Sequence, residues 1–414
     1  MNNNFTVLNN NNFFTTGYKT SKLKSNDGTE EWQLPNSIYF ANNDVALGYK
    51  YKIINSNFSD NLEGINLTDG KVLWSKEIKK NFGWNDVKKL NDSTILITSS
   101  GLHQINVNTG EGWSYEASTG RNDYKGTIAA NIIGIALMAT TGSGFYSYGK
   151  DVVRELVSNT LYNDSESAVY LASRDKLVKL NISGEKLWEK ELEKNQAAKS
   201  LLFEKENDLL MINLGYAYFN ENLIDHGTPY IALYDKHTGE QKYMKTVAEK
   251  KDMIRCMQMN DDRSTIILSF DNKIAKYNLT DGSLIKEIIY DSKKYGKPNK
   301  FIGTIHFEQT ANGFESLKKL YPDKNILITE KDFVLFLNDD LSIAKETKPD
   351  DYAFTFLEKE NLQLIVDKEK NIHVTDGNLE ERAILRISPA AQMVGNKIYD
   401  KNENELVVID LNNL

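Results

Sequence analysis

Short stretches in which apolar and polar residues alternate recur along the chain, and most of them end in a tight turn built on Asp-Gly or Thr-Gly. In the clearest copy, residues 65–74 (INLTDGKVLW), an apolar strand leads to Gly70, and Trp74 follows four residues later. Residues 180–188 (LNISGEKLW) reach Gly184 and then Trp188 in the same way. Gly or Asp supplies the positive φ that a tight turn needs, and a period of two is typical of strands, so each copy predicts a β-hairpin.

The hairpins recur at a spacing that indicates a repeat architecture. Their turns lie near residues 27, 69, 109, 184, 238, 281, 339 and 376, and the shorter separations are close to 40 residues. A period of roughly 40 to 45 with several short strands is typical of propeller blades, whereas helical repeats need apolar residues three and four apart. We therefore expect an all-β protein with a single propeller of about eight four-stranded blades. Seven blades is the second choice, and a β-sandwich is the alternative fold.

The two ends of the chain suggest how the ring closes. Residues 405–411 predict a strand that arrives at the motif with no strand after it, and residues 29–34 could supply the missing one. We expect the ring to close by pairing of the N- and C-terminal strands, which leaves no free sheet edge. The Asn-rich residues 1–12 are expected to be a disordered leader, and residues 13–414 a single domain.

The order of an apolar strand, Asp, Thr-Gly and Trp resembles the repeat of the quinoprotein-type (PQQ-like) β-propellers, Asp-x-x-Thr-Gly-x-x-x-Trp. The resemblance extends from about Lys22 to Leu411. It implies the propeller fold and admits two kinds of activity, since some members are quinone- and calcium-dependent dehydrogenases and others are scaffolds of outer-membrane assembly. Those dehydrogenases often carry a vicinal Cys pair, but Cys256 is the only cysteine here. The comparison favours the non-enzymatic branch, with no cofactor and no metal.

The sequence contains few other groupings of residues that indicate a catalytic or metal site. The five histidines lie in separate repeats, without the His-x-x-x-His or Cys-x-x-Cys spacing of a zinc site; they are His103, His226, His237, His306 and His373. His226 differs in placement because it lies beside Asp225 in a long insertion. We expect no catalytic residues, and the enzymatic alternative is a hydrolase or lyase with its site at the mouth of the central channel.

Charge narrows the class of partner. The formal net charge is −8 and the pI is near 5.4, which disfavours nucleic acid and anionic membranes, since both reward Lys and Arg patches. A neutral or basic protein is the more natural partner of a monomer with this charge. There is no secretory signal and no run of eighteen apolar residues, so we expect a cytoplasmic protein. The alternative is a periplasmic or secreted one whose signal was removed before Met1.

Three insertions enlarge one predicted face of the ring, near residues 118–150, 214–230 and 292–300, and a fourth, near 310–324, should lie on the opposite face. The spacing of Phe314, Leu317 and Leu320 in the fourth predicts a short helix. Aromatic residues and Arg are enriched in protein interfaces. The predicted partner-binding residues on the first face are Arg121, Tyr124, Phe145, Tyr146, Tyr148, Tyr216, Tyr218, Phe219, His226 and Tyr295.

These observations together favour a non-catalytic propeller that binds another protein. One specific version is an immunity protein that neutralises an antibacterial toxin, which suits an acidic, stand-alone binder. A scaffold or assembly factor of the envelope is the comparable alternative. A carbohydrate binder would need exposed aromatic platforms, and the repeat is expected to bury four of the five Trp.

Overall fold

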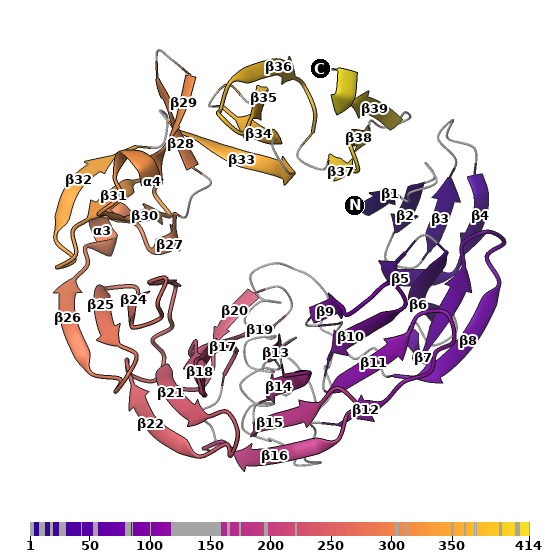
Figure 1. The fold of residues 1–414 in the computed structure, drawn as a ribbon, viewed down its shortest axis with the longest axis horizontal. Coiled ribbons are helices and arrows are strands. Elements are labelled where there is room, and N and C mark those ends of the chain that lie inside the picture. The colour runs from indigo at the N-terminus through magenta and orange to yellow at the C-terminus, as the bar shows by residue number, and fades with distance from the viewer. Residues whose placement is uncertain are drawn as a thin grey trace, which may run out of the picture.

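Antiparallel β-sheets stand radially around a ring, with the first strand of each sheet near the centre and the last at the rim (Figure 1). The computed structural model describes residues 4–7, 13–16, 20–24, 30–42, 44–52, 57–78, 84, 86–99, 101–116, 159–163, 166–173, 175–193, 198–219, 222–302, 306–310, 313–348, 352–359, 362–367, 369, 371–388, 391–401 and 406–413. Over these residues, the predicted all-β propeller of about eight four-stranded blades is confirmed.

The blades follow one another in chain order. Blades 1 to 4 consist of β1 (Asn4–Val7), β2 (Phe13–Thr16), β3 (Ser21–Lys24) and β4 (Glu30–Leu34); β5 (Asn36–Ala41), β6 (Val45–Lys52), β7 (Asn57–Asn66) and β8 (Val72–Glu77); β9 (Asp86–Lys89), β10 (Thr94–Thr98), β11 (Leu102–Asn106) and β12 (Ser114–Tyr115); and β13 (Asn159–Asn163), β14 (Ala168–Ala172), β15 (Lys176–Asn181) and β16 (Lys186–Glu191).

Blades 5 to 8 consist of β17 (Ser200–Lys205), β18 (Asp208–Asn213), β21 (Tyr230–Asp235) and β22 (Gln241–Thr246); β23 (Cys256–Met259), β24 (Thr265–Ser269), β25 (Lys273–Asn278) and β26 (Leu284–Ile289); β27 (Pro298–Phe301), β30 (Asn325–Thr329), β31 (Val334–Leu337) and β32 (Ile343–Thr347); and β33 (Tyr352–Lys359), β34 (Leu362–Val366), β35 (Ile372–Asp376) and β36 (Glu381–Leu385). A ninth, three-stranded sheet follows, made of β37 (Gln392–Val394), β38 (Lys397–Lys401) and β39 (Leu406–Asp410), and the 3-10 helix η2 (Leu411–Asn413) comes after it.

The recurrent turn joins the third strand of a blade to the fourth, and one local geometry repeats in it. In blade 2, the side chain of Asn66 accepts a hydrogen bond from the backbone of Thr68, and Gly70 has a φ of 69°. The register between the two strands shifts just before the turn, between Gly64 and Ile65. Gly tolerates this left-handed conformation without a Cβ clash, which explains why the motif carries Gly.

The tryptophans of the motif connect neighbouring blades. The indole nitrogen of Trp74 in blade 2 donates to the carbonyl of Val107 in blade 3, at 2.9 Å, and the ring covers Gly110. Trp188 in blade 4 likewise donates to the carbonyl of Lys236 in blade 5 and covers Gly239. Each ring therefore lies on the turn of the following blade, and a Gly there leaves room for it.

The hydrophobic core is divided among the interfaces between blades. The apolar residues of β18 and β21, including Leu210 and Leu233, pack against those of β24 and β25, including Ile266 and Leu268. Similar clusters join blades 2 and 3, 4 and 5, and 6 and 7. Because each sheet buries both faces against its neighbours, stacking around the ring creates the core.

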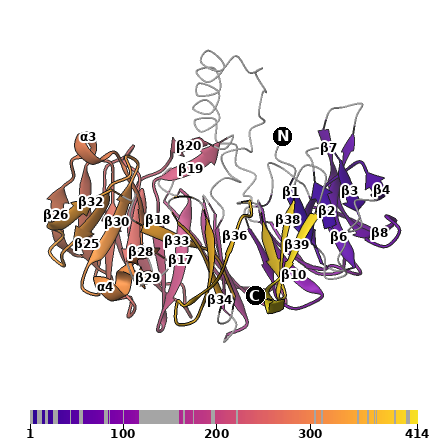
Figure 2. The same cartoon turned by 90° about the horizontal axis from the view of Figure 1, so that it is seen from above.

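The enlarged connections leave the ring on two faces (Figure 2). The upper face carries α3 (Ser292–Tyr295) and the hairpin of β19 (Tyr216–Phe219) and β20 (Asn222–Asp225), which forms a two-stranded sheet of its own. The lower face carries α4 (Leu317–Leu320) and the end of β29 (Gly313–Ser316). The predicted short helix is present as α4, but Phe314 lies in β29, which pairs with β28 (His306–Thr310) and through it with β33.

Two expectations about the chain ends need correction. Residues 4–7, expected within a disordered leader, form β1, which pairs with β2 and buries Val7 against Tyr399. The N- and C-terminal strands do not pair within the described chain, since β4 pairs with β3 and β39 with β38. Residues 4–16 supply the two inner strands of blade 1, so β4 completes that blade. The ends meet side by side, where the backbone NH of Val7 donates to Gln392 Oε1 at 3.2 Å.

Candidate functional site

The upper face gathers the described part of the predicted partner-binding set. The β19–β20 hairpin joins the second and third strands of blade 5, as the sequence predicted, and rises above the ring (Figure 2). In its antiparallel register, Tyr216 is opposite Asp225. Tyr216 is half-buried and packs on the core between blades 5 and 6, so its ring anchors the hairpin to the ring of blades.

The remaining predicted residues of this hairpin are placed differently. The backbones of Tyr218 and Phe219 belong to β19, while their side chains lie outside the described structure. His226 is half-buried at the base of the hairpin, where its backbone NH donates to the carbonyl of Gly215 at 3.1 Å. Asp225 is exposed. The hairpin thus offers an exposed carboxylate beside a half-buried imidazole.

Tyr295 lies in α3 and is only 6% exposed. Its hydroxyl donates to Glu346 at 2.5 Å, and Lys294 Nζ lies 2.7 Å from the same carboxylate. The ring packs against Tyr290 and Phe333 in the core between blades 6 and 7. Tyr295 therefore fixes α3 to the ring, while Lys293 and Lys294 of the same helix are exposed.

The other predicted residues, Arg121, Tyr124, Phe145, Tyr146 and Tyr148, belong to the insertion between blades 3 and 4 and lie outside the described residues. The structure therefore brings together only the members of the set that lie on β19–β20 and α3.

A row of charged side chains runs between these two elements, and sequence reasoning missed it. Arg255 precedes β23 and makes two hydrogen bonds with the carboxylate of Asp271, whose other neighbour is Lys297 at 3.0 Å. The hydrogen bonds that Arg255 donates to Asp271 hold the pKa of Arg255 above its usual range, and the negative charge of Asp225 adds to the effect. These residues lie in short connections between strands, and all of these connections are on the upper face. The sequence alone does not show that they share a face, because this depends on the order of strands in each blade.

A hollow of about 840 Å³ lies on the same face between blades 5 and 6. Its wall combines buried Val247 and Ala248 with the charged Glu249, Lys250 and Lys273. Lys273 Nζ donates to the carbonyl of Val247 and to Glu287, both at 3.1 Å. The upper face thus presents a projecting hairpin, a charged row and a shallow polar hollow, an arrangement suited to contact with a protein surface.

In the described part of the chain, no group of three or more His, Cys, Asp or Glu side chains is arranged to hold a metal ion. Cys256 is half-buried, and burial raises the pKa of its thiol to about 11. A thiol is a nucleophile only as thiolate, so this cysteine is poorly suited to nucleophilic chemistry.

Residues 4–140 match the family model described as PQQ_2, outer membrane protein assembly factor BamB. The match covers less than half of the chain and supports the resemblance of the repeat to that of the PQQ-like β-propellers. The chain finds no match among the curated proteins. No helix in the described ranges is long and apolar enough to cross a membrane.

Solved structures similar to this chain include BamB from Moraxella catarrhalis, with 12% identity, a TM-score of 0.40 and coverage of 97% of this chain and 94% of that one. The dihydro-heme d1 dehydrogenase NirN in complex with DHE has 11% identity and a TM-score of 0.42, covering 99% and 75%. Sqt1 from Saccharomyces cerevisiae has 10% identity and a TM-score of 0.43, covering 88% and 92%.

Proposed function

We propose that this chain is a non-catalytic scaffold propeller that binds another protein on its upper face. The observation that carries the proposal is the β19–β20 hairpin, which pairs with none of the blades and projects from the ring (Figure 2). A two-stranded hairpin alone is marginally stable in water. A partner that packs against it would add the contacts that the blades do not give it.

The chemistry of the face supports a partner of mixed character. Arg255, Lys297 and the exposed lysines of α3 provide donors, while Asp225 and Glu249 provide acceptors. The whole chain carries a net charge of −8, so a neutral or basic partner gains from long-range attraction.

Among the finer versions, we favour an assembly scaffold of the envelope over a toxin-neutralising immunity protein. The match of residues 4–140 to the assembly-factor model supports the scaffold, whereas the immunity version has only the acidic charge behind it. A scaffold of the envelope would act in the periplasm, and the cytoplasmic location expected from the sequence would argue against it. Fractionation of the native cells distinguishes the two compartments.

The test is a shortened hairpin. Residues 217–224 are replaced by Asn-Gly, so that a two-residue turn joins Tyr216 to Asp225, which are already opposite each other. The control changes Asp261 and Lys319 to Ser, both exposed and both reached from the lower face. Each tagged chain is cross-linked in native cells, and captured proteins are quantified by mass spectrometry.

We expect one stoichiometric partner with the wild-type chain and with the lower-face control, and its loss with the shortened hairpin. Equal capture by all three chains would place the partner elsewhere. Absence of any stoichiometric partner would contradict the scaffold and give weight to an enzyme or a carbohydrate binder.

A further inference from the structure

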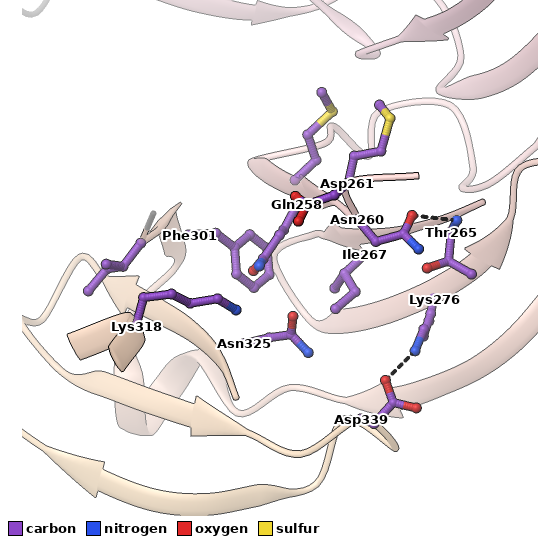
Figure 3. A pocket seen from close by; sticks show the side chains of 13 residues that line it. Gln258, Asn260, Asp261, Thr265, Ile267, Lys276, Phe301, Lys318, Asn325 and Asp339 are labelled. Carbon is purple, nitrogen blue, oxygen red and sulfur yellow. Dashed lines mark hydrogen bonds and ion pairs between the residues drawn. The ribbon is translucent and has the colours of Figure 1, made fainter. Parts of the chain in front are cut away.

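A second cleft, of about 540 Å³, lies between blades 6 and 7 and opens to the lower face (Figure 3). One wall is the end of β23 with Met257, Gln258 and Met259, and the other contains Phe301 of β27. Lys318 of α4 and Asn325 of β30 close one end, and the ion pair of Lys276 with Asp339 closes the other. Its volume is within the range of small-molecule and peptide pockets.

The course of β27 explains why a cleft opens here. In blade 5, the inner strand pairs with the second strand through to a tight turn, where Lys205 is opposite Asp208. In blade 7, the inner strand pairs only from Pro298 to Phe301, and the register shifts within that stretch. The chain then leaves the sheet for β28, β29 and α4, so β30 begins at Asn325 without an inner strand opposite its first residue.

The interface between blades 4 and 5 shows how the same position is otherwise filled. Lys179 occupies in β15 the place of Lys276 in β25, each directly before the register shift. Lys179 Nζ lies 3.0 Å from Glu166 and from the carbonyl of Lys236, and its side chain is 6% exposed. Lys276 has a single carboxylate partner, Asp339, which is 88% exposed. The 6–7 interface therefore leaves space where the 4–5 interface has an ion-pair network.

Two polar side chains of the cleft make fewer hydrogen bonds within the described residues than they could. Gln258 Oε1 is buried and accepts no hydrogen bond from the described residues. An unsatisfied buried acceptor costs on the order of 1–3 kcal/mol, and a half-turn of the amide exchanges the positions of its oxygen and nitrogen. Lys318 is half-buried and donates only to the carbonyl of Pro322, at 3.2 Å, with no carboxylate beside it in the described chain. Lys318, Gln258 and Asn325 point into the same space beside Phe301 (Figure 3).

We infer that this cleft binds a carboxylate that stands next to an N–H donor and an apolar side chain, as in an N-acylated amino acid or the C-terminus of a peptide. The carboxylate pairs with Lys318 and accepts from the amide of Asn325, and the neighbouring N–H donates to Gln258 Oε1. The apolar side chain lies against Ile267 and Phe301, which line the cleft and belong to the core between blades 6 and 7. This site is on the face opposite to the proposed partner surface, and it goes beyond the proposed function.

The test uses four probes: N-acetyl-L-phenylalanine, its amide, a five-residue peptide ending in Phe, and the same peptide amidated. Binding to the full chain is measured by calorimetry and by the NMR signals of the Ile methyl groups, labelled with ¹³C, because Ile267 lines the cleft. We expect saturable binding of both acids and about tenfold weaker binding of both amides, the usual size of one lost charge-assisted hydrogen bond.

The matched variants are Lys318→Met and Lys319→Met, neighbours in α4 of which only the first lines the cleft. We expect Lys318→Met to weaken the acids about tenfold and to leave the amides unchanged, and Lys319→Met to bind like wild type. Unchanged thermal unfolding of both variants shows that the fold is intact. The chain with the shortened β19–β20 hairpin should still bind the acids, so a failed scaffold proposal does not affect this result.

A peptide acid that binds about tenfold more tightly than the N-acetyl amino acid identifies chain ends as the source, and equal affinity identifies free small molecules. Both results support the site. Three results overturn it: no saturation by either acid up to about 10 mM, amides that bind as tightly as acids, or a Lys318→Met chain that binds as wild type does.

Discussion

In blades 1 to 5, an aromatic ring of the outer strand lies on the turn of the following blade, whereas blades 6 to 8 have no aromatic residue at this position. This position belongs to the fourth strand and lies opposite the last residue of the third strand before the register shift. In blade 3 its equivalent is Trp113, whose ring covers Gly184. The position holds Trp32, Trp74, Trp113, Trp188 and Tyr243 in blades 1 to 5, and Lys286, Lys345 and Ala383 in blades 6 to 8.

The contrast shows what the aromatic ring contributes. The hydroxyl of Tyr243 in blade 5 donates to the carbonyl of Leu279 at 2.8 Å, and its ring covers Gly282. Lys286 in blade 6 is exposed, and its positive charge lowers the pKa of Asp340 in blade 7. A ring that packs and donates fixes the distance between two blades in a way that a solvated ammonium does not. The cleft lies at the first interface without a ring.

The largest effect is expected from removing one of these rings. Trp188 is 9% exposed and donates to the carbonyl of Lys236 at 3.1 Å. Trp188→Ala should lower the free energy of unfolding by about 3–5 kcal/mol, because it leaves a cavity between blades 4 and 5 and removes the hydrogen bond of the indole to the carbonyl of Lys236. Lys286→Ala, at the equivalent exposed position, should change it by less than about 0.5 kcal/mol. Urea denaturation compares the two, and equal losses would mean that the ring does not distinguish the regions.

The ion pairs at the two interfaces should differ in the same direction. Glu166 lies 3.0 Å from Lys179 and 2.6 Å from Lys236, and these ammonium groups lower its pKa to about 2. Glu166→Gln takes the carboxylate from the largely buried Lys179 and leaves Lys236 only Glu204, at 3.8 Å, so it should cost about 2–3 kcal/mol. Asp339→Asn at the exposed pair with Lys276 should cost no more than about 1 kcal/mol. The comparison fails if the second substitution is as costly as the first in chemical denaturation.

Much of this contrast is visible in the sequence. Asp-Gly and Thr-Gly turns with a following Trp identify the blades because the turn needs a positive φ and the ring needs a partner sheet. In blades 7 and 8, the turn residue is Leu341 or Leu379, with φ of 68° and 66°, so the motif is degenerate but the geometry persists. A Leu in the left-handed region of φ cannot be recognised from the sequence, since Leu rarely adopts this conformation. This explains why the last two copies of the motif look weak.

The ring closure and the cleft could not be read from the sequence. The strand β1 is short and lies in an Asn-rich segment, so residues 1–12 look like a leader until the pairing of β1 with β2 is known. The charged row on the upper face and the cleft both join residues from two blades, such as Asp271 with Lys297 and Gln258 with Lys318. Such meetings depend on which connections share a face, and no local pattern encodes that.

A smaller effect is expected from adding a single methyl group at two glycines with similar backbone geometry. Gly184 has a φ of 83°, and a Cβ there would come within 2.4 Å of the Trp113 ring, whereas a Cβ at Gly395, with a φ of 61°, would meet nothing within 4 Å. Both Ala substitutions place a Cβ on a backbone in the left-handed region, which costs about 1 kcal/mol. Only Gly184→Ala must also displace Trp113, at about 1 kcal/mol more. Thermal unfolding of the two variants measures the difference, and identical values would show that Trp113 yields without cost.

The last contrast concerns two histidines at equivalent places, the second residue of the third strand in blades 3 and 8. Burial, with a smaller contribution from the positive charge of Lys76, lowers the pKa of His103 to about 4. Its hydrogen-bond partners within the described residues are the hydroxyls of Ser99, at 3.2 Å, and Ser114, at 2.9 Å. Burial also opposes the charged form of His373, but Asp367 and Glu381, at 3.0 and 2.5 Å, outweigh it and hold its pKa above the usual range.

The two should therefore respond to pH with opposite signs. A lowered pKa means that the unfolded chain binds the proton first, so His103 lowers stability as pH falls below about 6.5, by roughly 0.7 kcal/mol between pH 7 and 6. A raised pKa means that the contribution of His373 is fully present below about 6.5 and is lost as pH rises through its folded pKa. His103→Asn should flatten the acid side of the stability curve, and His373→Asn the alkaline side. NMR titration of the two imidazole rings provides the direct measurement, and a single common pKa would show that the carboxylates of blade 8 leave His373 unchanged.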